Sequence, residues 1–528
     1  MAAQGHDETR QEPGSPPDPT RIDPSFSEPT VADVQYARPV DPWAEAEAAA
    51  VAAGGHLPYQ VSGPSAGTPA PGVGDPAGKT GGRSRRAYRI GLWSTAGAAA
   101  VALGVTAAVV LWPSSSIDFH RLGEPSVFTP GIALTSAFSD ATVIGDRAYY
   151  VSAAANGVAA VTAVDTASGE ELWHGNTTLS AARWDRLIAT EAGPLLVAGI
   201  GSGSTETRME LLDESGGASV WHRDGLAAAD SIHLGTGVVF VVADGGKLLY
   251  SLDSGTGGTV QVTRNTIGST IVVPTTPADL TGPADATGTA INPALADDNP
   301  FVQVTSRGAV MVRDMRELGT TAERDEIAAT GSGMVAHDGR LFVPESGSSR
   351  RIWSYDLAKI NTAEPVALYT SQQSGADLGK LTPCGELLCF VETPGYDRKK
   401  AEVVALDVTG LGEKWRLPVP DVTSLVPVGD AVAAVTTTTT TLIGADGKAV
   451  WSDQPGVTVR LNDGNLLRFS DDLTTGYAED RSVAGVPLGG EPVELGQALG
   501  VRPDTCSWNT YALACVGKEN FVLYRFSE

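Results

Sequence analysis

Hydrophobic and polar positions alternate in short runs along most of the chain after Trp112. Runs such as "RAYYVSA" (147–153) and "GVVFVVADG" (237–245) are rich in Val, Tyr and Ala, and Gly, Asp, Asn or Pro separates one run from the next. Short runs of β-formers bounded by turn residues are typical of strands, and helix signals are nearly absent. The pattern predicts an all-β fold for residues 113–528.

An eleven-residue frame repeats within these runs. It carries an Asp directly after a strand, then a Ser- or Thr-containing turn with Gly, and a Trp at its end; its copies span 163–173, 211–221, 251–261 and 405–415, and a degenerate copy ends at Trp451. Their spacing gives a unit of about 40–55 residues, enough for four short strands with their turns. Such a unit is the size of one blade of a β-propeller.

Each residue type in the frame has a structural use. An Asp after a strand accepts backbone N–H bonds in the turn, and Gly permits the positive φ angle that reverses the chain. A Trp on the next, outer strand can fill the gap between neighbouring blades. We interpret the frame as a fastener between blades, formed by Ala163, Asp165, Ser168, Gly169, Trp173, Asp213, Gly217, Trp221, Asp253, Thr256, Gly257, Asp407, Trp415 and Trp451.

The pattern A-x-D-x-x-[T/S]-G-x-x-x-W resembles the tryptophan-docking motif of the PQQ-like β-propeller superfamily. The copy at 163–173 matches at every position, the copy at 251–261 has Gln261 in place of Trp, and the copy at 211–221 matches in part. The resemblance implies a propeller of four-stranded blades from about Phe119 to Phe526. This superfamily includes quinoprotein alcohol dehydrogenases and a lipoprotein of the outer-membrane barrel-assembly machinery, so the motif specifies a fold and not a function.

The number of blades is less constrained than the fold. Nine candidate units can be written, of which 457–490 and the unit with the long insert 274–300 are weak. We favour eight blades, with seven or nine as alternatives. The last run, "NFVLYRFSE", lacks an outer strand, and "IDFHRLGE" (117–124) can supply it and close the ring, which would remove exposed sheet edges.

A membrane anchor is expected before the propeller. Residues 90–112 contain no charged side chain, and a helix of this length can cross a hydrocarbon core of about 30 Å. Basic residues precede it (Lys79, Arg83, Arg85, Arg86 and Arg89), so the N-terminus is expected in the cytoplasm and the propeller outside. About 80 residues precede the span, which favours an uncleaved signal anchor over a cleaved signal peptide.

The remaining N-terminal part, residues 1–89, is rich in Pro, Ala and Gly and has few large apolar residues, which predicts a disordered cytoplasmic tail. The whole arrangement of tail, basic-flanked single span and exported propeller resembles single-span actinobacterial envelope proteins. It implies a single-pass protein of the cell membrane whose propeller is extracytoplasmic.

The four cysteines form two close pairs, Cys384 with Cys389 and Cys506 with Cys515. Both pairs fall where one predicted strand turns into the next, and facing positions of a hairpin bring Cβ atoms within disulfide reach. Three connectivities are formally possible, of which the local one needs no long-range coincidence. A metal site would require C-x₂-C spacing or nearby His, so we expect structural disulfides in an oxidising compartment.

Charge and motif content argue for binding over catalysis. The net charge is -25, so nucleic acid is an unfavourable partner. A PQQ-dependent dehydrogenase is the alternative that the resemblance raises, but such enzymes typically place PQQ over a disulfide of adjacent cysteines, and this chain has no Cys-Cys pair. The "ADDNP" sequence at 296–300 has oxygen ligands for Ca²⁺ but is more simply an acidic loop.

The sequence therefore predicts a non-enzymatic, membrane-anchored propeller that needs no cofactor or metal and has no catalytic residues. Its partners are the bilayer, through residues 90–112, and an envelope protein or a small ligand at the propeller. A scaffold or sensor is the favoured function. A glycan- or small-molecule-binding propeller is a further alternative, which the expected burial of the Trp side chains disfavours.

Overall fold

A computed structural model describes residues 116–134, 138–201, 203–291, 300–325, 333–345, 350–474 and 476–528. All of these residues belong to one compact unit, Ala53–Glu528, and none belongs to the other unit, Met1–Ala52. The predicted span at 90–112 and the tail at 1–89 lie outside the described residues. Within the described part of the chain, no helix is long and apolar enough to cross a membrane.

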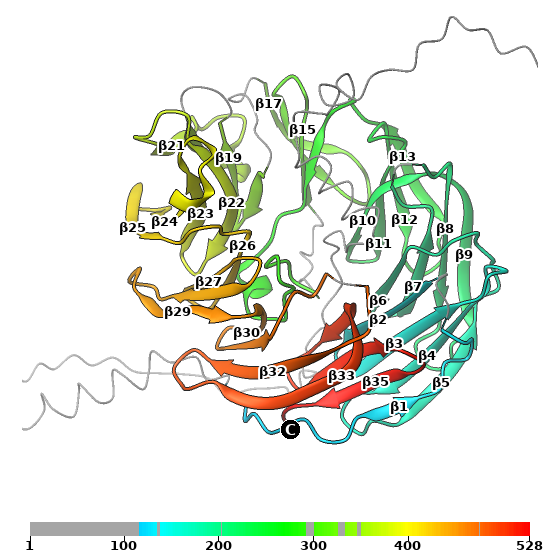
Figure 1. The fold of residues 1–528 in the computed structure, drawn as a ribbon. Helices are drawn as coiled ribbons and strands as arrows, with labels where there is room; N and C mark the ends of the chain where they lie inside the picture. The colour runs from blue at the N-terminus through cyan, green and yellow to red at the C-terminus, as the bar shows by residue number, and fades with distance from the viewer. Residues whose placement is uncertain are drawn as a thin grey trace, which may run out of the picture. The chain divides into compact units, whose positions relative to one another are not determined.

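The described residues form seven four-stranded antiparallel sheets and one seven-stranded sheet (Figure 1). Sheet 1 comprises β2 (Phe138–Ile144), β3 (Arg147–Ala153), β4 (Ala159–Asp165) and β5 (Glu171–Asn176). Sheet 2 comprises β6 (Arg186–Thr190), β7 (Gly193–Ala198), β8 (Glu206–Leu212) and β9 (Ser219–Ala227). Sheet 3 comprises β10 (Ala229–Gly235), β11 (Val238–Ala243), β12 (Leu248–Asp253) and β13 (Thr259–Arg264).

Sheets 4 to 7 follow in chain order. Sheet 4 comprises β14 (Thr270–Val272), β15 (Pro300–Val304), β16 (Val310–Asp314) and β17 (Thr320–Arg324), and sheet 5 comprises β18 (Val335–His337), β19 (Arg340–Pro344), β20 (Arg351–Asp356) and β21 (Val366–Thr370). Sheet 6 comprises β22 (Asp377–Cys384), β23 (Leu387–Thr393), β24 (Glu402–Asp407) and β25 (Gly412–Pro418), and sheet 7 comprises β26 (Ser424–Val428), β27 (Ala431–Val435), β28 (Thr439–Ile443) and β29 (Ala449–Pro455). Short 3₁₀ turns lie at Pro277–Leu280, Leu357–Lys359, Pro394–Tyr396 and Arg398–Lys400.

Sheet 8 is larger because one long strand, β33, pairs with two groups of strands. Its strands, in spatial order, are β1 (Ser126–Phe128), β35 (Phe521–Arg525), β34 (Ala512–Gly517), β33 (Val493–Trp508), β32 (Glu479–Pro487), β31 (Asn465–Phe469) and β30 (Val457–Asn462). The first half of β33 pairs with β32 and the second half with β34. Sheet 8 therefore contains more strands than one blade, and the expected number of eight blades stays a prediction.

Sequential order and packing give the sheets a propeller arrangement. The first strands of neighbouring sheets pack against one another, as β2 does with β6, β22 with β26 and β26 with β30. The sheets follow one another around a common centre from cyan to red in Figure 1. The all-β prediction is confirmed, and the sheets of four strands agree with the blade-sized repeat of the sequence.

The first described strand closes the ring with the last one. Val127 of β1 pairs with Val522 of β35, in an antiparallel ladder. The sequence prediction assigned this strand to residues 117–124, and that assignment is wrong by a few residues. The segment 117–124 has no strand, but its amides bond to the same sheet: His120 N donates to Phe526 O at 2.9 Å and Leu122 N to Leu495 O at 2.7 Å.

Burial explains why the second strand of a sheet can be a continuous run of apolar residues in the sequence. All six residues of β11 are buried, because neighbouring sheets cover both of its faces, whereas β13 at the outer edge of the same sheet is almost wholly exposed. Hydrophobic clusters join consecutive sheets; the largest joins sheets 1, 2 and 3. Strands covered on both faces lose the polar alternation of half-exposed strands.

Candidate functional site

The docking tryptophans lie on the outer strand of one sheet and contact the turn of the next. Trp173 of β5 is 9% exposed and its indole Nε1–H donates to Glu214 O in sheet 2 at 2.7 Å. Trp221 of β9 is 7% exposed and donates to Ser254 O in sheet 3 at 2.8 Å. Each indole therefore covers apolar surface and ties two sheets together through one hydrogen bond.

The glycine of each following frame makes room for the preceding indole. A Cβ atom on Gly217 would lie 2.4 Å from Trp173 Cε3, and one on Gly257 would lie 2.5 Å from Trp221 Cε3. The same holds for Gly447, whose Cβ would lie 2.5 Å from Trp415 Cγ. The glycine thus serves both the positive φ angle of its turn and the close approach of an aromatic ring. The sequence interpretation included only the first of these uses.

The remaining frame tryptophans are less buried. Trp415 of β25 packs against the cluster of sheets 6 and 7, and its buried Nε1 has no hydrogen-bond partner among the described residues. Trp451 of β29 is half-buried against the cluster that sheets 7 and 8 share. In the first copy, Gly169 approaches Ser126 of the ring-closing strand β1 instead of an indole.

The frame aspartates hold the turns. Asp165 accepts bonds from Ser168 N at 2.7 Å and from Ala167 N at 3.0 Å. The backbone bond from Ser168 lowers the pKa of Asp165 below its ordinary value. Hydrogen bonds in the corresponding turns likewise lower the pKa of the other frame carboxyls: mainly from the Ser215 hydroxyl to Asp213, the Thr256 hydroxyl to Asp253 and the Gly410 amide to Asp407.

Three consecutive joints between neighbouring sheets use charged or polar contacts, whereas the joints that follow sheets 1, 2, 6 and 7 use tryptophan. Between sheets 3 and 4, Arg316 pairs with Asp253 at 3.4 Å. Between sheets 4 and 5, Arg324 of β17 donates to Ala363 O at 2.6 Å and pairs with Glu364 at 3.0 Å. The outer positions of these sheets carry Gln261 and Ala322 instead of Trp.

The joint between sheets 5 and 6 contains a buried carboxylate. Glu392 of β23 is fully buried, accepts from Tyr369 Oη at 2.8 Å and pairs with Arg416 at 2.6 Å. Arg416 also donates to Tyr369 Oη at 2.8 Å. Burial and the bond to Glu392 raise the pKa of Tyr369, so the phenol stays protonated and donates to the carboxylate.

All four cysteines are paired in the two local disulfides that the sequence favours. Cys384–Cys389 joins the first two strands of sheet 6, with Cα atoms 5.8 Å apart, and Cys506–Cys515 joins β33 to β34, with Cα atoms 4.2 Å apart. Among the described residues there is no group of three or more His, Cys, Asp or Glu placed to hold a metal ion. Of the "ADDNP" segment, residues 296–299 lie outside the described residues.

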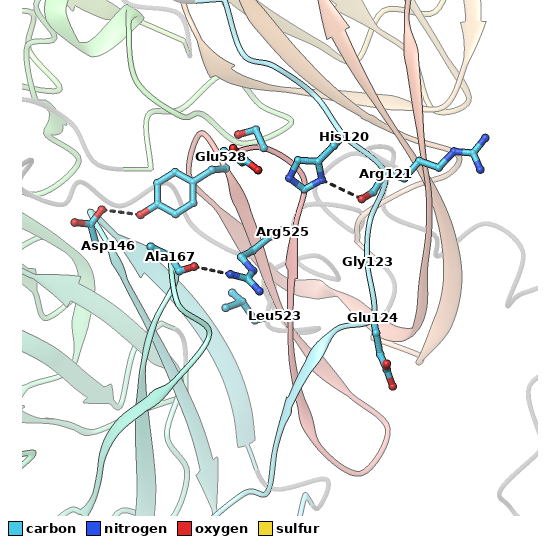
Figure 2. A pocket seen from close by; sticks show the side chains of 11 residues that line it. His120, Arg121, Gly123, Glu124, Asp146, Ala167, Leu523, Arg525 and Glu528 are labelled. Carbon is cyan, nitrogen blue, oxygen red and sulfur yellow. Dashed lines mark hydrogen bonds between the residues drawn. The ribbon is translucent and has the colours of Figure 1, made fainter.

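A hollow of about 650 Å³ lies at the seam where the first described residues meet the last. It is lined by segment 120–124, by turns of sheet 1 and by the end of the chain, and we call it the seam hollow: His120, Arg121, Gly123, Glu124, Asp146, Ala167, Tyr511, Leu523, Arg525, Ser527 and Glu528 (Figure 2). The side chains of Arg121 and Glu124 point away from Arg525 in this view. The exposed side chains of the lining carry both charge signs: Arg121 and Arg525 are positive, and Glu124 and Asp146 are negative.

Two fixed groups form the wall of the seam hollow. Tyr511 Oη donates to Asp146 at 2.6 Å and lies 2.9 Å from Thr166 Oγ1, and burial with this bond raises the pKa of Tyr511 to about 12. Arg525 donates through one nitrogen to Ala167 O at 2.6 Å. A guanidinium has five N–H donors, so Arg525 has donors left for an occupant. Sequence reasoning missed this site because ring closure alone brings its parts together.

The solved structures to which this chain is similar share little sequence with it. No protein-family model matches the chain, and no curated protein matches it. Similar solved structures include BamB from Moraxella catarrhalis (13% identity, 76% of this chain and 98% of that chain, TM-score 0.39). They also include a eukaryotic initiation factor (12%, 75% and 92%, TM-score 0.47) and a europium-containing methanol dehydrogenase (12%, 66% and 84%, TM-score 0.39). TM-scores below 0.5 do not establish a shared fold, and the propeller arrangement described above follows from the four-stranded sheets and the packing of their first strands.

Proposed function

We propose that this chain is a membrane-anchored, extracytoplasmic propeller that binds another envelope protein at its seam hollow and catalyses no reaction. The observation that carries the proposal is the position of this hollow. His120 in its lining comes eight positions after Trp112, the end of the predicted span. Eight extended residues reach at most roughly 28 Å, so an occupant would be held close to the membrane surface.

The character of the seam hollow favours a protein partner over a small ligand. Small-molecule sites are mostly enclosed and apolar, with few polar groups. The lining residues His120, Arg121 and Arg525 are exposed and charged or polar, and Tyr511 is half-buried beside them. Arg and Tyr are over-represented where protein interfaces carry most of their binding energy. An extended segment of a partner could pair with both charge signs in the hollow.

The disulfides support the extracytoplasmic location. Disulfides form and persist in oxidising compartments and are rare in the cytosol. Both pairs here join neighbouring strands of single sheets. The charge bias around residues 90–112 independently predicts the same side of the membrane for the propeller.

Site-specific photo-crosslinking in living cells tests the proposal. A photoreactive residue replaces His120 in the full-length chain, and the control places it at Ile267, which is 65% exposed and belongs to the distant turn before β14. We expect a protein adduct from position 120 only, lost when Arg525→Glu is added. Equal adducts from both positions, or none from position 120, would contradict the proposal.

Two further outcomes would replace the proposed function. Only low-mass adducts at position 120 would identify a small-ligand sensor. A higher melting temperature of the full-length protein with PQQ and Ca²⁺, at saturating concentrations, would favour the dehydrogenase alternative. We expect no shift with that cofactor pair.

A further inference from the structure

Residues 273–291, which follow β14, pack against other sheets instead of returning directly to sheet 4. We call these residues the strap. Thr275 forms a parallel bridge to His337 of β18 in sheet 5, and Ala284 forms an antiparallel bridge to Arg460 of β30 in sheet 8. The strap therefore leaves sheet 4 and adds its backbone to the inner strands of two other sheets.

Contacts with sheet 7 complete this path. Ser424 Oγ of β26 donates to Ala286 O at 2.8 Å, and a Cβ atom on Gly288 would lie 2.5 Å from Leu425 O. The green segment near β26 and β30 in Figure 1 lies on the inner side of these strands. The strap thus packs closely against sheets on the side of the ring opposite its origin.

Arg460 is the main side chain that holds the strap. It is fully buried in β30, a strand whose six residues are all buried, and its guanidinium donates to Asp279 O at 2.6 Å, Gly282 O at 2.7 Å and Pro427 O at 2.9 Å. Two of these carbonyls belong to the strap and the third to β26. Without the strap, two of the three acceptors would be missing from a buried charge, which is a costly state.

Arg460 stays charged under physiological conditions. Burial lowers its pKa to about 10, and the carboxylates of Asp279, Asp285 and Asp463 oppose that shift. Two of these carboxylates also lie on the strap. The strap therefore supplies both hydrogen-bond acceptors and countercharge to the same buried guanidinium.

The backbone of Arg460 takes part as well. Its carbonyl accepts from Ala284 N at 2.9 Å and from Trp508 Nε1 at 3.3 Å, so Arg460 contacts β33 as well as the strap. At the other end, Thr275 N donates to Ala336 O at 2.9 Å and Asp338 N donates to Thr275 O at 3.1 Å. Backbone pairing to other sheets therefore holds the strap at Thr275, near its start, and at Ala284, in its middle.

We propose that the strap, pinned by Arg460, is a conformational device that ties sheet 4 to the inner strands of sheets 5, 7 and 8 and stabilises sheet 4, whose joints to sheets 3 and 5 lack a docking tryptophan. When the pin is released, the strap detaches from β30 and β26, and sheet 4 becomes the first part of the propeller to open. Sheets 1 and 2, joined by Trp173, keep their protection.

Hydrogen exchange of the full-length protein tests this coupling. In Arg460→Met we expect the amides of Ala284 and Ile291 to exchange at least about ten-fold faster, followed by those of β15 and β16, with sheets 1 and 2 unchanged. Arg460→Lys, which keeps the charge but not the planar fork of donors, should give a smaller increase. The matched control is Arg468→Met on the neighbouring strand β31, which contacts Gln454 and Glu494 and not the strap.

Three outcomes would overturn the proposal. Unchanged exchange of the strap in Arg460→Met would show that Arg460 does not hold it. Faster exchange in all sheets alike, or the same change in Arg468→Met, would show a general loss of packing in place of a coupled strap and sheet. If Arg460→Met does not fold, the comparison passes to Arg460→Lys and Ser424→Ala, which must raise exchange in the strap before sheets 1 and 2.

Discussion

Two joints of the ring connect neighbouring sheets through side chains of different chemistry. Between sheets 1 and 2, the outer strand presents Trp173, which is 9% exposed and packs on Gly217. Between sheets 4 and 5, the outer strand presents Arg324, which bonds to Ala363 O and pairs with the largely exposed Glu364. Each side chain reaches from an outer strand to the turn of the next sheet.

The difference in chemistry predicts an uneven ring. Removing a large buried aromatic side chain costs about 3–5 kcal/mol, whereas exposed ion pairs contribute about 0–1 kcal/mol. Ion pairs also weaken with salt, and apolar contacts do not. Sheets 1 to 3 should therefore form the most stable sector, and sheet 4, with a polar joint on each side, should depend more on solution conditions and on the strap.

Removing an indole should give the largest effect. We expect Trp173→Ala to lower the free energy of unfolding by about 3–5 kcal/mol, since it leaves a cavity over Gly217. Urea denaturation of the full-length protein in detergent measures this. Gln261→Ala, at the matching position of sheet 3, is the control and should change stability by less than about 0.5 kcal/mol. Similar losses in both variants would remove the distinction between the joints.

Converting a polar joint into an aromatic one sharpens the comparison. Leu318 takes the place of the frame glycine in sheet 4, is only 4% exposed and has a φ angle of 52°. Gln261→Trp alone should therefore destabilise, because the new indole meets the Leu318 side chain. Adding Leu318→Gly should recover stability, with a favourable coupling energy of about 1–3 kcal/mol in a double-mutant cycle. Additive effects of the two changes would contradict the docking geometry.

Acid should weaken the turns that support the aromatic joints. The pKa values of Asp165, Asp213, Asp253 and Asp407 are lowered in the folded protein. A lowered carboxyl pKa contributes stability that is present above the unfolded value, about 3.9, and is lost as pH falls through the folded value. We expect the urea midpoint to fall between pH 5 and pH 3, and to fall less in Asp213→Asn. An equal pH slope in that variant would contradict this role.

The sequence was sufficient for the fold because its signals are local and repeated. Alternating runs and the Asp–Gly–Trp frame predict sheets of four strands without any long-range information. The strand that closes the ring was predicted at 117–124, but it lies at Ser126–Phe128. A strand of three residues has almost no hydrophobic pattern by which the sequence could locate it. The seam hollow depends on that closure, and so no local motif could identify it.

The strap shows a different kind of limit. Its residues belong to the long insert 274–300 that weakened the blade assignment in the sequence, and no periodicity marks their contacts across the ring. Arg460, a charged residue within the predicted strand "VTVRLN" (457–462), was the one available signal, since a buried Arg requires partners from elsewhere in the chain. A single sequence does not specify which carbonyls those partners are.

Salt should distinguish the two kinds of joint without any mutation. Raising NaCl from 0.05 M to 1 M screens ion pairs that have one exposed partner, such as Arg324–Glu364, and should speed hydrogen exchange in sheet 4 more than in sheets 1 and 2. Arg324→Met should lower stability by about 0–1 kcal/mol and reduce this salt dependence. If salt affected sheets 1 and 4 equally, the polar joints would not be the weaker ones.

The smallest expected effect concerns a turn with a leucine in a glycine-like conformation. Leu411 in sheet 6 has a φ angle of 57° and is 52% exposed, and no tryptophan docks there because β21 of sheet 5 carries none. Leu411→Gly relieves about 1–2 kcal/mol of backbone strain, while the added freedom of Gly in the unfolded chain offsets about 0.5–1 kcal/mol of it. The net gain should be at most about 1 kcal/mol, read from the urea midpoint. A marked loss would mean that the Leu411 side chain is part of the joint and that sheets 5 and 6 are held by more than the contacts of Tyr369 with Glu392 and Arg416.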